Sequence, residues 1–201
     1  MKHIFTTAAL LIAGMLQAQT SNSDSTQHLF IDVHHLPSGK VNYNDVLAAH
    51  AKDLAVQGKY GTQFQKFWVD ESKGVIYCLS SAPDSNAVKH THRDAHGLMP
   101  DQLFQVSAGM EDKVSGSKPF FLDVHQFAPN SVKAADVAKA HEQDLAVQQK
   151  RGVRFLNYWV DEQKGLVLCL SQAPDAGAVT ETHRDAHGLL PVSVLQVKQG
   201  Q

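Results

Sequence analysis

A gapless internal repeat limits what this chain can fold into more than any other feature of its 201 residues. Residues 30–106 align on residues 121–197, and about 42 of the 77 aligned pairs are identical. The longest identical stretch joins residues 91–98 to 182–189. We therefore predict two copies of one small domain, over 28–107 and 119–199. A linker at 108–118, rich in Ser, Gly and charge, is expected to connect them.

The first residues of the sequence have the features of an export signal. Lys2 supplies a positive charge, residues 4–16 form an apolar stretch too short to span a bilayer, and Ala18 precedes a polar, Ser-rich segment. We predict a signal peptide over 1–18 and a polar tail over 19–27, with the mature protein periplasmic or secreted. Since no Cys directly follows the apolar stretch, we expect no lipid anchor, and we expect no membrane anchor after cleavage.

Each copy has the pattern strand, helix, strand, strand, helix, strand. In the first copy we predict strands at 29–36, 63–70, 75–82 and 103–107, a helix over 44–57 capped by Asn44, and a helix from its cap Asp84 to about residue 96, ended by Gly97. The fold class is α+β, with two tandem ferredoxin-like (βαββαβ) domains, each carrying both helices on one face of its sheet. The other face must be buried, so we expect the copies to pack sheet to sheet as an intramolecular pseudo-dimer, monomeric or weakly oligomeric.

Twelve histidines are the unusual feature of a composition whose apolar content, 43%, is ordinary. Histidine is the commonest metal ligand in proteins. The 18 Lys and Arg residues against 20 Asp and Glu give a net charge of -2, without the clustered positive charge that nucleic acids and anionic membranes attract. We therefore expect a metal ion, and no nucleic acid, as the partner.

Four histidines of the first copy recur in the second, whereas His35 and His90 are replaced by Gln126 and Glu181. We predict the recurring histidines as metal ligands: His34, His50, His92 and His96, matched by His125, His141, His183 and His187. Further residues that recur could ligate the ion or orient its ligands: Asp32, Asp53 and Cys78, matched by Asp123, Asp144 and Cys169.

Helical spacing brings two pairs of these side chains to shared faces. His92 and His96 lie one turn apart on the second predicted helix, so their imidazoles can share one ion. His50 and Asp53 lie on one face of the first helix, and His50 falls on the apolar stripe of that helix and points inward. An Asp beside a ligating His commonly orients the imidazole ring, a role that suits Asp53 or Asp32.

Each of these patterns also has a simpler interpretation. An inward His50 can be a hydrogen-bonded core residue, and an HxxxH pair can be incidental. Cys78 can be a small buried hydrophobe rather than a ligand. In an oxidising compartment a Cys78–Cys169 disulfide is also allowed, if the third strands of the two copies meet.

The chain resembles the small bacterial ferredoxin-like domains of a nickel-binding family, formerly a domain of unknown function. The resemblance covers nearly all of both copies and rests on residues 32–34, 49–54, 68–71, 78–83 and 92–98, with their partners in the second copy. The first signature reads Ala-His-Ala-Lys-Asp-Leu at 49–54 and Ala-His-Glu-Gln-Asp-Leu at 140–145. The resemblance implies a domain that dimerises and binds divalent nickel. This chain differs in carrying two domains and an export signal, and its duplication can replace the dimer.

Three functions are therefore weighed. The leading hypothesis is an exported protein that sequesters or buffers a divalent transition metal, nickel first, with copper and zinc as alternatives because imidazole suits all three. The second is a metal-dependent or dimeric α+β-barrel-like enzyme in which His50 and Asp53 act as a general base. No nucleophile elbow, phosphate loop or cofactor fingerprint supports it, and we predict no catalytic residues. The third is a binding or scaffold module whose histidines belong to the core.

Overall fold

The structure, a computed structural model, describes residues 26–109, 112–114 and 116–201. The predicted signal peptide over 1–18, and all of the predicted tail except its last two residues, lie outside this part of the chain. Among the residues described, no helix combines the length and the apolar character needed to cross a membrane.

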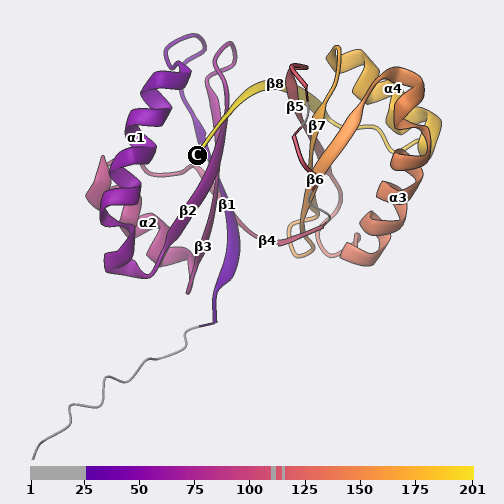
Figure 1. Ribbon diagram of the computed structural model, residues 1–201. Coiled ribbons are helices and arrows are strands. Elements are labelled where there is room, and N and C mark those ends of the chain that lie inside the picture. The colour runs from indigo at the N-terminus through magenta and orange to yellow at the C-terminus, as the bar shows by residue number, and fades with distance from the viewer. Residues whose placement is uncertain (1–25, 110–111, 115) are drawn as a thin grey trace, which may run out of the picture.

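The two halves have the same order of elements, which confirms a mixed α/β fold built from a repeat (Figure 1). The first half contains β1 (His28–His35), α1 (Tyr43–Val56), β2 (Gln63–Asp70), β3 (Val75–Ala82), α2 (Ser85–Ala95) and β4 (Gln102–Ala108). The second contains β5 (Phe120–Gln126), α3 (Ala134–Val147), β6 (Arg154–Asp161), β7 (Leu166–Gln172), α4 (Ala176–Ala186) and β8 (Ser193–Gly200). Short 3-10 turns, Gln57–Tyr60 and Gln148–Arg151, follow α1 and α3.

Local chemistry explains where these helices begin and end. Helix α2 begins after Asp84, whose carboxylate accepts hydrogen bonds from two backbone N–H groups of the first turn. It ends at Ala95, and the chain turns away through the cap His96 and Gly97, which has φ 79°. Helix α1 begins after Asn42, so the predicted cap Asn44 is wrong by two residues. The Asn42 side chain accepts the N–H groups of Asn44 and Asp45. Asn44 is therefore one of the donors that the cap satisfies.

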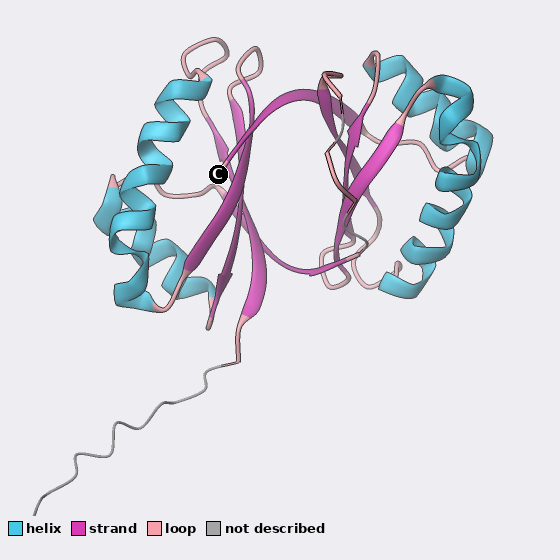
Figure 2. Cartoon of the chain, in the orientation of Figure 1, coloured by secondary structure: helices cyan, strands magenta, loops and turns pink. Residues whose placement is uncertain are grey.

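The eight strands form one closed barrel in the order β1-β3-β2-β8-β5-β7-β6-β4 (Figure 2). We predicted two separate sheets packed face to face, but the structure joins them along both edges. Strand β4 pairs with β1 and then, through Ser107 and Ala108, with β6 of the other half. Strand β8 pairs with β5 and β2 in the equivalent way. An edge strand has unpaired N–H and C=O groups, and the extended ends of β4 and β8 satisfy those of the neighbouring half.

The predicted linker at 108–118 therefore begins inside the barrel wall rather than after it. Ala108 belongs to β4, and the Gly109 N–H donates to the Tyr158 carbonyl of β6. Gly109 packs so closely on Tyr158 that a Cβ there would lie 1.8 Å from the ring. Gly200, at the end of β8, packs in the same way on Phe67, with a Cβ 2.2 Å from that ring. Each half thus closes the barrel by placing a glycine against an aromatic ring of the other.

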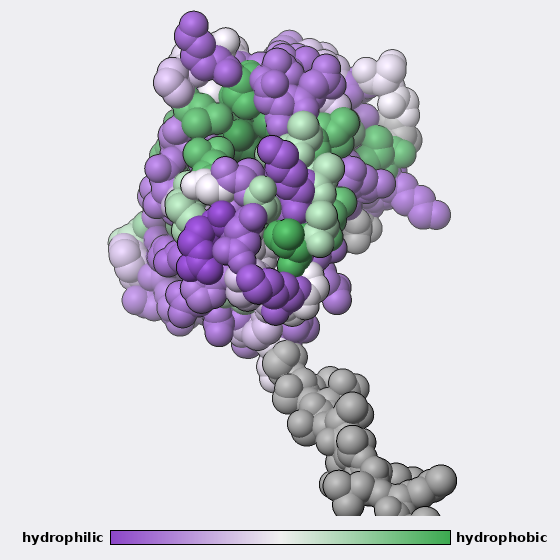
Figure 3. All heavy atoms as spheres, turned by 90° about the vertical axis from the view of Figure 1, so that its left-hand side faces the viewer, coloured by the Kyte–Doolittle hydropathy of each residue, from purple (hydrophilic) through white to green (hydrophobic). Residues whose placement is uncertain are grey.

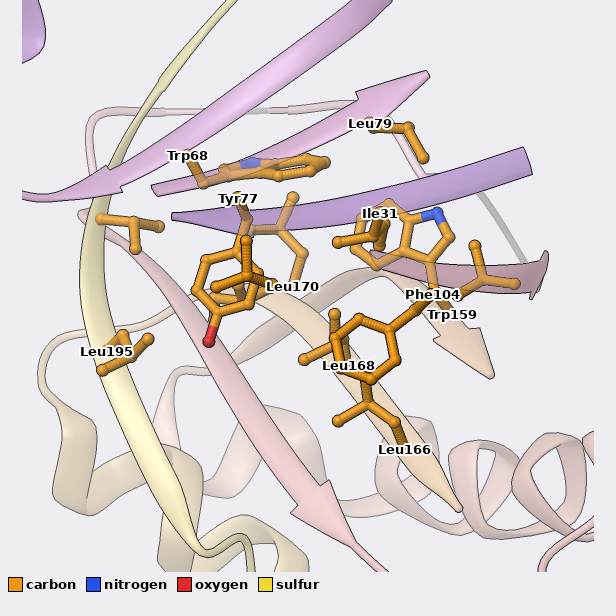
Figure 4. Close-up of a cluster of buried hydrophobic side chains, with 14 of the residues drawn as sticks. Ile31, Trp68, Tyr77, Leu79, Phe104, Trp159, Leu166, Leu168, Leu170 and Leu195 are labelled. Carbon is orange, nitrogen blue, oxygen red and sulfur yellow. The ribbon is translucent and has the colours of Figure 1, made fainter. Parts of the chain in front are cut away.

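Strand alternation divides the side chains between a shared interior and two outer layers. The barrel interior is filled by apolar residues of both halves, including Trp68 and Trp159, whose ring centroids lie 5.1 Å apart (Figure 4). The outward side chains of each half form a separate core beneath its two helices. In β1, Ile31 and Val33 point into the barrel, so Asp32 and His34 face α1 and α2. The polar residues predicted to bind metal therefore lie under the helices, outside the barrel.

Candidate metal centre

Strand β1 places a buried carboxylate and a buried imidazole on the helix side of the barrel wall. Asp32 is fully buried and His34 is 3% exposed. The His34 Nε2 lies 3.0 Å from the Asp32 Oδ1. Asp53 of α1 and His92 of α2 lie beside these two side chains, because both helices pack across the same face of the sheet (Figure 1).

His92 of α2 connects two buried carboxylates that come from different elements. Its Nδ1 lies 3.1 Å from the Oδ1 of Asp53 on α1, and its Nε2 lies 3.3 Å from the Oδ1 of Asp32. His92 is 1% exposed and Asp53 3%. The His96 Nε2 lies 3.3 Å from the other oxygen of Asp53. His92 and His96 thus lie side by side as predicted, with 3.3 Å between His92 Nδ1 and His96 Nε2, and both contact Asp53.

These contacts determine charges within the cluster formed by Asp32, His34, Asp53, His92 and His96 in the metal-free protein. Burial alone would lower the pKa of His92, but its contacts with Asp32 and Asp53 outweigh burial and raise that pKa to about 10. Burial would raise the pKa of each carboxyl, yet the imidazoles of His34, His92 and His96 leave the pKa values of Asp32 and Asp53 below the ordinary value. At neutral pH Asp32 and Asp53 are therefore carboxylates and His92 is an imidazolium.

Hydrogen bonding is uneven within this cluster. Both oxygens of Asp32 and the Nε2 of His92 are buried without a hydrogen-bond partner among the residues described, because the short contacts to Asp32 are not aligned as hydrogen bonds. The Asp53 side is satisfied, since its oxygens accept from His92 Nδ1 and His96 Nε2. Buried polar groups in proteins are normally paired, so Asp32 and His92 Nε2 present unused ligand capacity.

His96 has both ring nitrogens engaged. Its Nδ1 accepts the backbone N–H of Leu98, which leaves Nε2 to carry the proton and donate to Asp53. Sequence reasoning missed the Leu98 contribution because a backbone N–H leaves no mark in a residue pattern. The arrangement indicates that His96 orients Asp53, and Asp53 in turn orients His92.

His50 lines one pocket together with His34, His92 and His96 but makes no hydrogen bond to them. It is 4% exposed, and neither of its ring nitrogens has a hydrogen-bond partner among the described residues. Its ring packs against Phe64 and Phe67, with centroids 6.2 and 5.3 Å away. The structure records no hydrogen bond between His50 and Asp53, so the pair expected for a general base is not assembled here.

Cys78 and Cys169 are free and buried, in separate cores beneath the helices of their own halves. The disulfide considered between them is wrong, because both cysteines point outward from opposite walls of the barrel. Cys78 pairs in register with Asp32. Burial and the nearby carboxylates raise the pKa of both thiols, which are neutral in the metal-free protein.

The second half repeats the cluster with nearly the same distances. The Oδ1 of Asp123 lies 3.1 Å from His125 Nε2 and 3.4 Å from His183 Nε2. The Nδ1 of His183 lies 3.0 Å from Asp144 Oδ1, and His187 contacts the other Asp144 oxygen at 3.3 Å. Contacts with Asp123 and Asp144 again outweigh burial and raise the pKa of His183 to about 10. Like His50, His141 has two ring nitrogens without a hydrogen-bond partner in the part of the chain that the structure describes.

Each half therefore contains two groups of side chains whose potential ligand atoms lie within 4.8 Å of one another. In the first half these are Asp32, His34 and His92, and Asp53, His92 and His96. In the second they are Asp123, His125 and Cys169, and Asp144, His183 and His187. Of the eight predicted histidine ligands, His50 and His141 belong to no such group, and their role as ligands stays a prediction.

A repeated α/β barrel with His and Asp clusters under its helices defines a candidate metal-binding protein in two halves. The family profile described as "Nickel responsive protein SCO4226-like" matches residues 30–106 and 121–197. The chain belongs to this family, in two tandem copies. No similar sequence was found among curated proteins.

Solved structures with a related arrangement include SCO4226 from Streptomyces coelicolor A3(2). It is 32% identical, covers 41% of this chain and 99% of its own, and has a TM-score of 0.38. An anthrone oxidase-like protein is 11% identical over 89% of this chain and 94% of its own, with a TM-score of 0.49. A mutant chlorite dismutase from Candidatus Nitrospira defluvii is 6% identical over 87% and 91%, with a TM-score of 0.48. The family assignment rests on the sequence match to both repeats.

Proposed function

We propose that this chain is an exported metal-binding protein that sequesters or buffers Ni²⁺, with one equivalent site in each half. The ion is bound by Asp32, His34 and His92 in the first half and by Asp123, His125 and His183 in the second. The observation that carries the proposal is that a carboxylate and an imidazole nitrogen lie buried side by side in each half without hydrogen-bond partners among the described residues. In the first half these are both oxygens of Asp32 and the Nε2 of His92, and in the second the Oδ2 of Asp123 and the Nε2 of His183. The Oδ1 of Asp123 is hydrogen-bonded to His125 Nε2, so binding in the second half displaces that hydrogen bond.

The spacing of these atoms suits coordination of one ion. Ligand atoms that lie about 2.1 Å from a metal and subtend angles of about 90–110° are roughly 3.0–3.4 Å apart. The Asp32 Oδ1 lies 3.0 Å from His34 Nε2 and 3.3 Å from His92 Nε2. Small movements of these side chains would therefore bring all three atoms onto a shared ion.

Charge balance supports the same assignment. In the metal-free protein the buried carboxylates of Asp32 and Asp53 both contact one imidazolium, that of His92. A divalent ion that replaces the His92 proton neutralises both carboxylates. Burying a charge without an opposite charge beside it costs free energy, so binding of the divalent ion stabilises the buried carboxylates.

Asp53 and His96 have an orienting role in this arrangement. The Asp53 carboxylate accepts from His92 Nδ1 and leaves Nε2 directed at Asp32, as carboxylates commonly orient ligating histidines. If the ion instead lay between Asp53, His92 and His96, the His96 Nε2 would have to give up its hydrogen bond to Asp53. The ligand set suits copper and zinc as well, and nickel is favoured by the family description.

Isothermal titration of the metal-free protein with Ni²⁺, Cu²⁺ and Zn²⁺ tests this function. We expect about two ions per chain, and a His92→Ala variant that retains only the second site. Asp53→Asn should weaken the first site by about 10- to 100-fold, since orienting partners of metal ligands contribute that much. His90→Glu, which installs the residue found at Glu181, is the matched control and should bind as wild type does. Equal binding by wild type and a His92→Ala/His183→Ala protein would refute the proposed sites.

Export is tested separately from binding. When the full-length chain is produced in a bacterium that has a periplasm, we expect the protein in the periplasmic fraction or the medium, beginning at Gln19. Intact-mass measurement of the purified protein identifies that start. A cytoplasmic protein that retains residues 1–18 would contradict export and leave the metal sites unaffected.

A further inference from the structure

Each half has a second feature besides its charged cluster: an apolar pocket between the helices and the barrel wall. In the first half it is lined by aliphatic side chains of α1, β3 and neighbouring loops, namely Val41, Val46, Ala49, Ile76 and Leu98. The charged cluster forms one side of this pocket, and His50 forms another. The second half has an equivalent pocket lined by Val132, Val137, Ala140, Val167 and Leu189, together with His141.

His50 and His141 are buried polar groups of these pockets that the metal cluster does not engage. Asp45 also lines the first pocket, and Ser131 and Asp136 line the second. Each is at least 95% buried, lines its pocket, and has two ring nitrogens without a hydrogen-bond partner in the described part of the chain. Burial lowers the pKa of both histidines, so each ring is neutral, with one N–H donor and one acceptor nitrogen. A hydroxyl can pair with either ring nitrogen, because it accepts a hydrogen bond from the N–H and donates one to the bare nitrogen.

The size of the pockets limits the ligand. The first pocket has a volume of about 150 Å³ and the second about 220 Å³. An apolar protein cavity of about 150 Å³ accommodates one benzene ring. The second pocket is larger, and Val167 occupies the position of the bulkier Ile76 in its wall. The first pocket therefore suits one ring, and the second has room for a larger molecule.

Apolar surface continues outward from the first pocket. Leu98 lines the pocket and is 38% exposed, and Leu47, Leu54 and Met99 of the same half are exposed as well. Figure 3 faces the helix-covered side of this half and shows hydrophobic residues gathered among hydrophilic ones. An uncharged, mainly apolar molecule thus meets a compatible surface, while the buried carboxylates of Asp32 and Asp53 disfavour an anion.

We propose that each half binds a small uncharged ring compound bearing one hydroxyl group, with the hydroxyl hydrogen-bonded to His50 or His141 and the ring held by the apolar wall. The second pocket accepts the larger members of this class. The proposal does not depend on a bound metal, so its failure and the failure of nickel binding are distinguishable.

Titration of the metal-free full-length protein with phenol, benzene and 2-naphthol tests the proposal. Ring-nitrogen NMR signals of His50 and His141 report the two pockets separately within one chain. We expect phenol to shift both signals and to bind at least about fivefold more tightly than benzene, because one hydrogen bond contributes about that factor. 2-Naphthol should shift only the His141 signal.

Two variants make the test specific. His141→Phe should reduce phenol affinity in the second pocket to the level of benzene, while the His50 signal confirms that the first pocket and the fold are intact. Val167→Ile, a one-methylene change that copies Ile76, should weaken 2-naphthol binding in the second pocket and leave phenol binding unchanged. The proposal is overturned if phenol binds no more tightly than benzene, or if its effects map outside these two pockets.

Discussion

The two halves of the barrel are most alike where they carry the ligand cluster and differ around it. Every Asp and His of the cluster is identical between halves. The distances from the ring nitrogens of His92 to its two carboxylates differ by about 0.1 Å from the equivalent distances of His183. The surroundings differ, because Asn42, Ile76 and His90 of the first half correspond to Lys133, Val167 and Glu181 of the second. The pockets, which Ile76 and Val167 line at equivalent positions, also differ in volume, about 150 against 220 Å³. The halves therefore share one cluster of Asp and His side chains but differ in helix capping and in pocket volume.

The largest expected effect comes from removing the central imidazole of either cluster. His92→Ala leaves Asp32 and Asp53 buried without their cation, and loss of one partner from a buried ion pair commonly costs about 3–5 kcal/mol. His183→Ala should cost a similar amount, because its contacts are equivalent. Urea unfolding of the metal-free proteins measures both. A cost below about 1 kcal/mol for either variant would contradict the buried ion-pair account of that half.

A smaller effect is expected from deprotonating the same imidazoles, since a neutral ring can still donate one hydrogen bond. The pKa of His92 and His183 is about 10 in the folded protein and 6.5 ordinarily, so their stabilising charge is fully present below about pH 6.5 and is lost as the pH rises toward 10. The urea midpoint of the metal-free protein should fall over this window. A His92→Gln/His183→Gln protein should show a shallower fall, and an unchanged slope would contradict the charge assignment.

The barrel is closed at two equivalent contacts, Gly109 on Tyr158 and Gly200 on Phe67. A Cβ at Gly109 or Gly200 would meet the ring of Tyr158 or Phe67, and overpacking of this kind costs about 1–3 kcal/mol. We expect Gly109→Ala and Gly200→Ala each to lower the free energy of unfolding of the whole chain by that amount. Gly58→Ala is the control, since no atom lies within 4 Å of a Cβ there. If alanine at one of these two glycines does not lower the free energy of unfolding, the two contacts do not contribute equally to closing the barrel.

The smallest expected effect concerns the first turn of α3. The Asn42 side chain caps α1 through two hydrogen bonds, whereas a Lys133 side chain has no acceptor to cap α3. Lys133→Asn should therefore stabilise the protein by about 0.5–1 kcal/mol, and Asn42→Ala should destabilise it by about 1 kcal/mol. Thermal unfolding of both variants measures the difference. A Lys133→Asn protein that is less stable than wild type would contradict this account of the two caps.

Much of this organisation could be predicted from the sequence, because it follows from local patterns. The duplication, the order of elements and the pairing of His92 with His96 depend on repeats and helical spacing. The joining of β4 to β6 could not be predicted, since it depends on how far one strand extends beyond its own sheet. The separation of His50 from the cluster was also missed. Inward-facing spacing places that side chain in the core but does not give its distance from residues of α2.

The most direct test of the central claim is the position of nickel in crystals of the metal-loaded protein, located by anomalous scattering. The account predicts one ion per half, about 2.0–2.2 Å from Asp32, His34 and His92, and at the equivalent place near Asp123, His125 and His183. The carboxylate of Asp53 should then remain hydrogen-bonded to His92 Nδ1 without touching the ion. Nickel bound between Asp53 and His96, or on exposed histidines such as His35, would contradict the account.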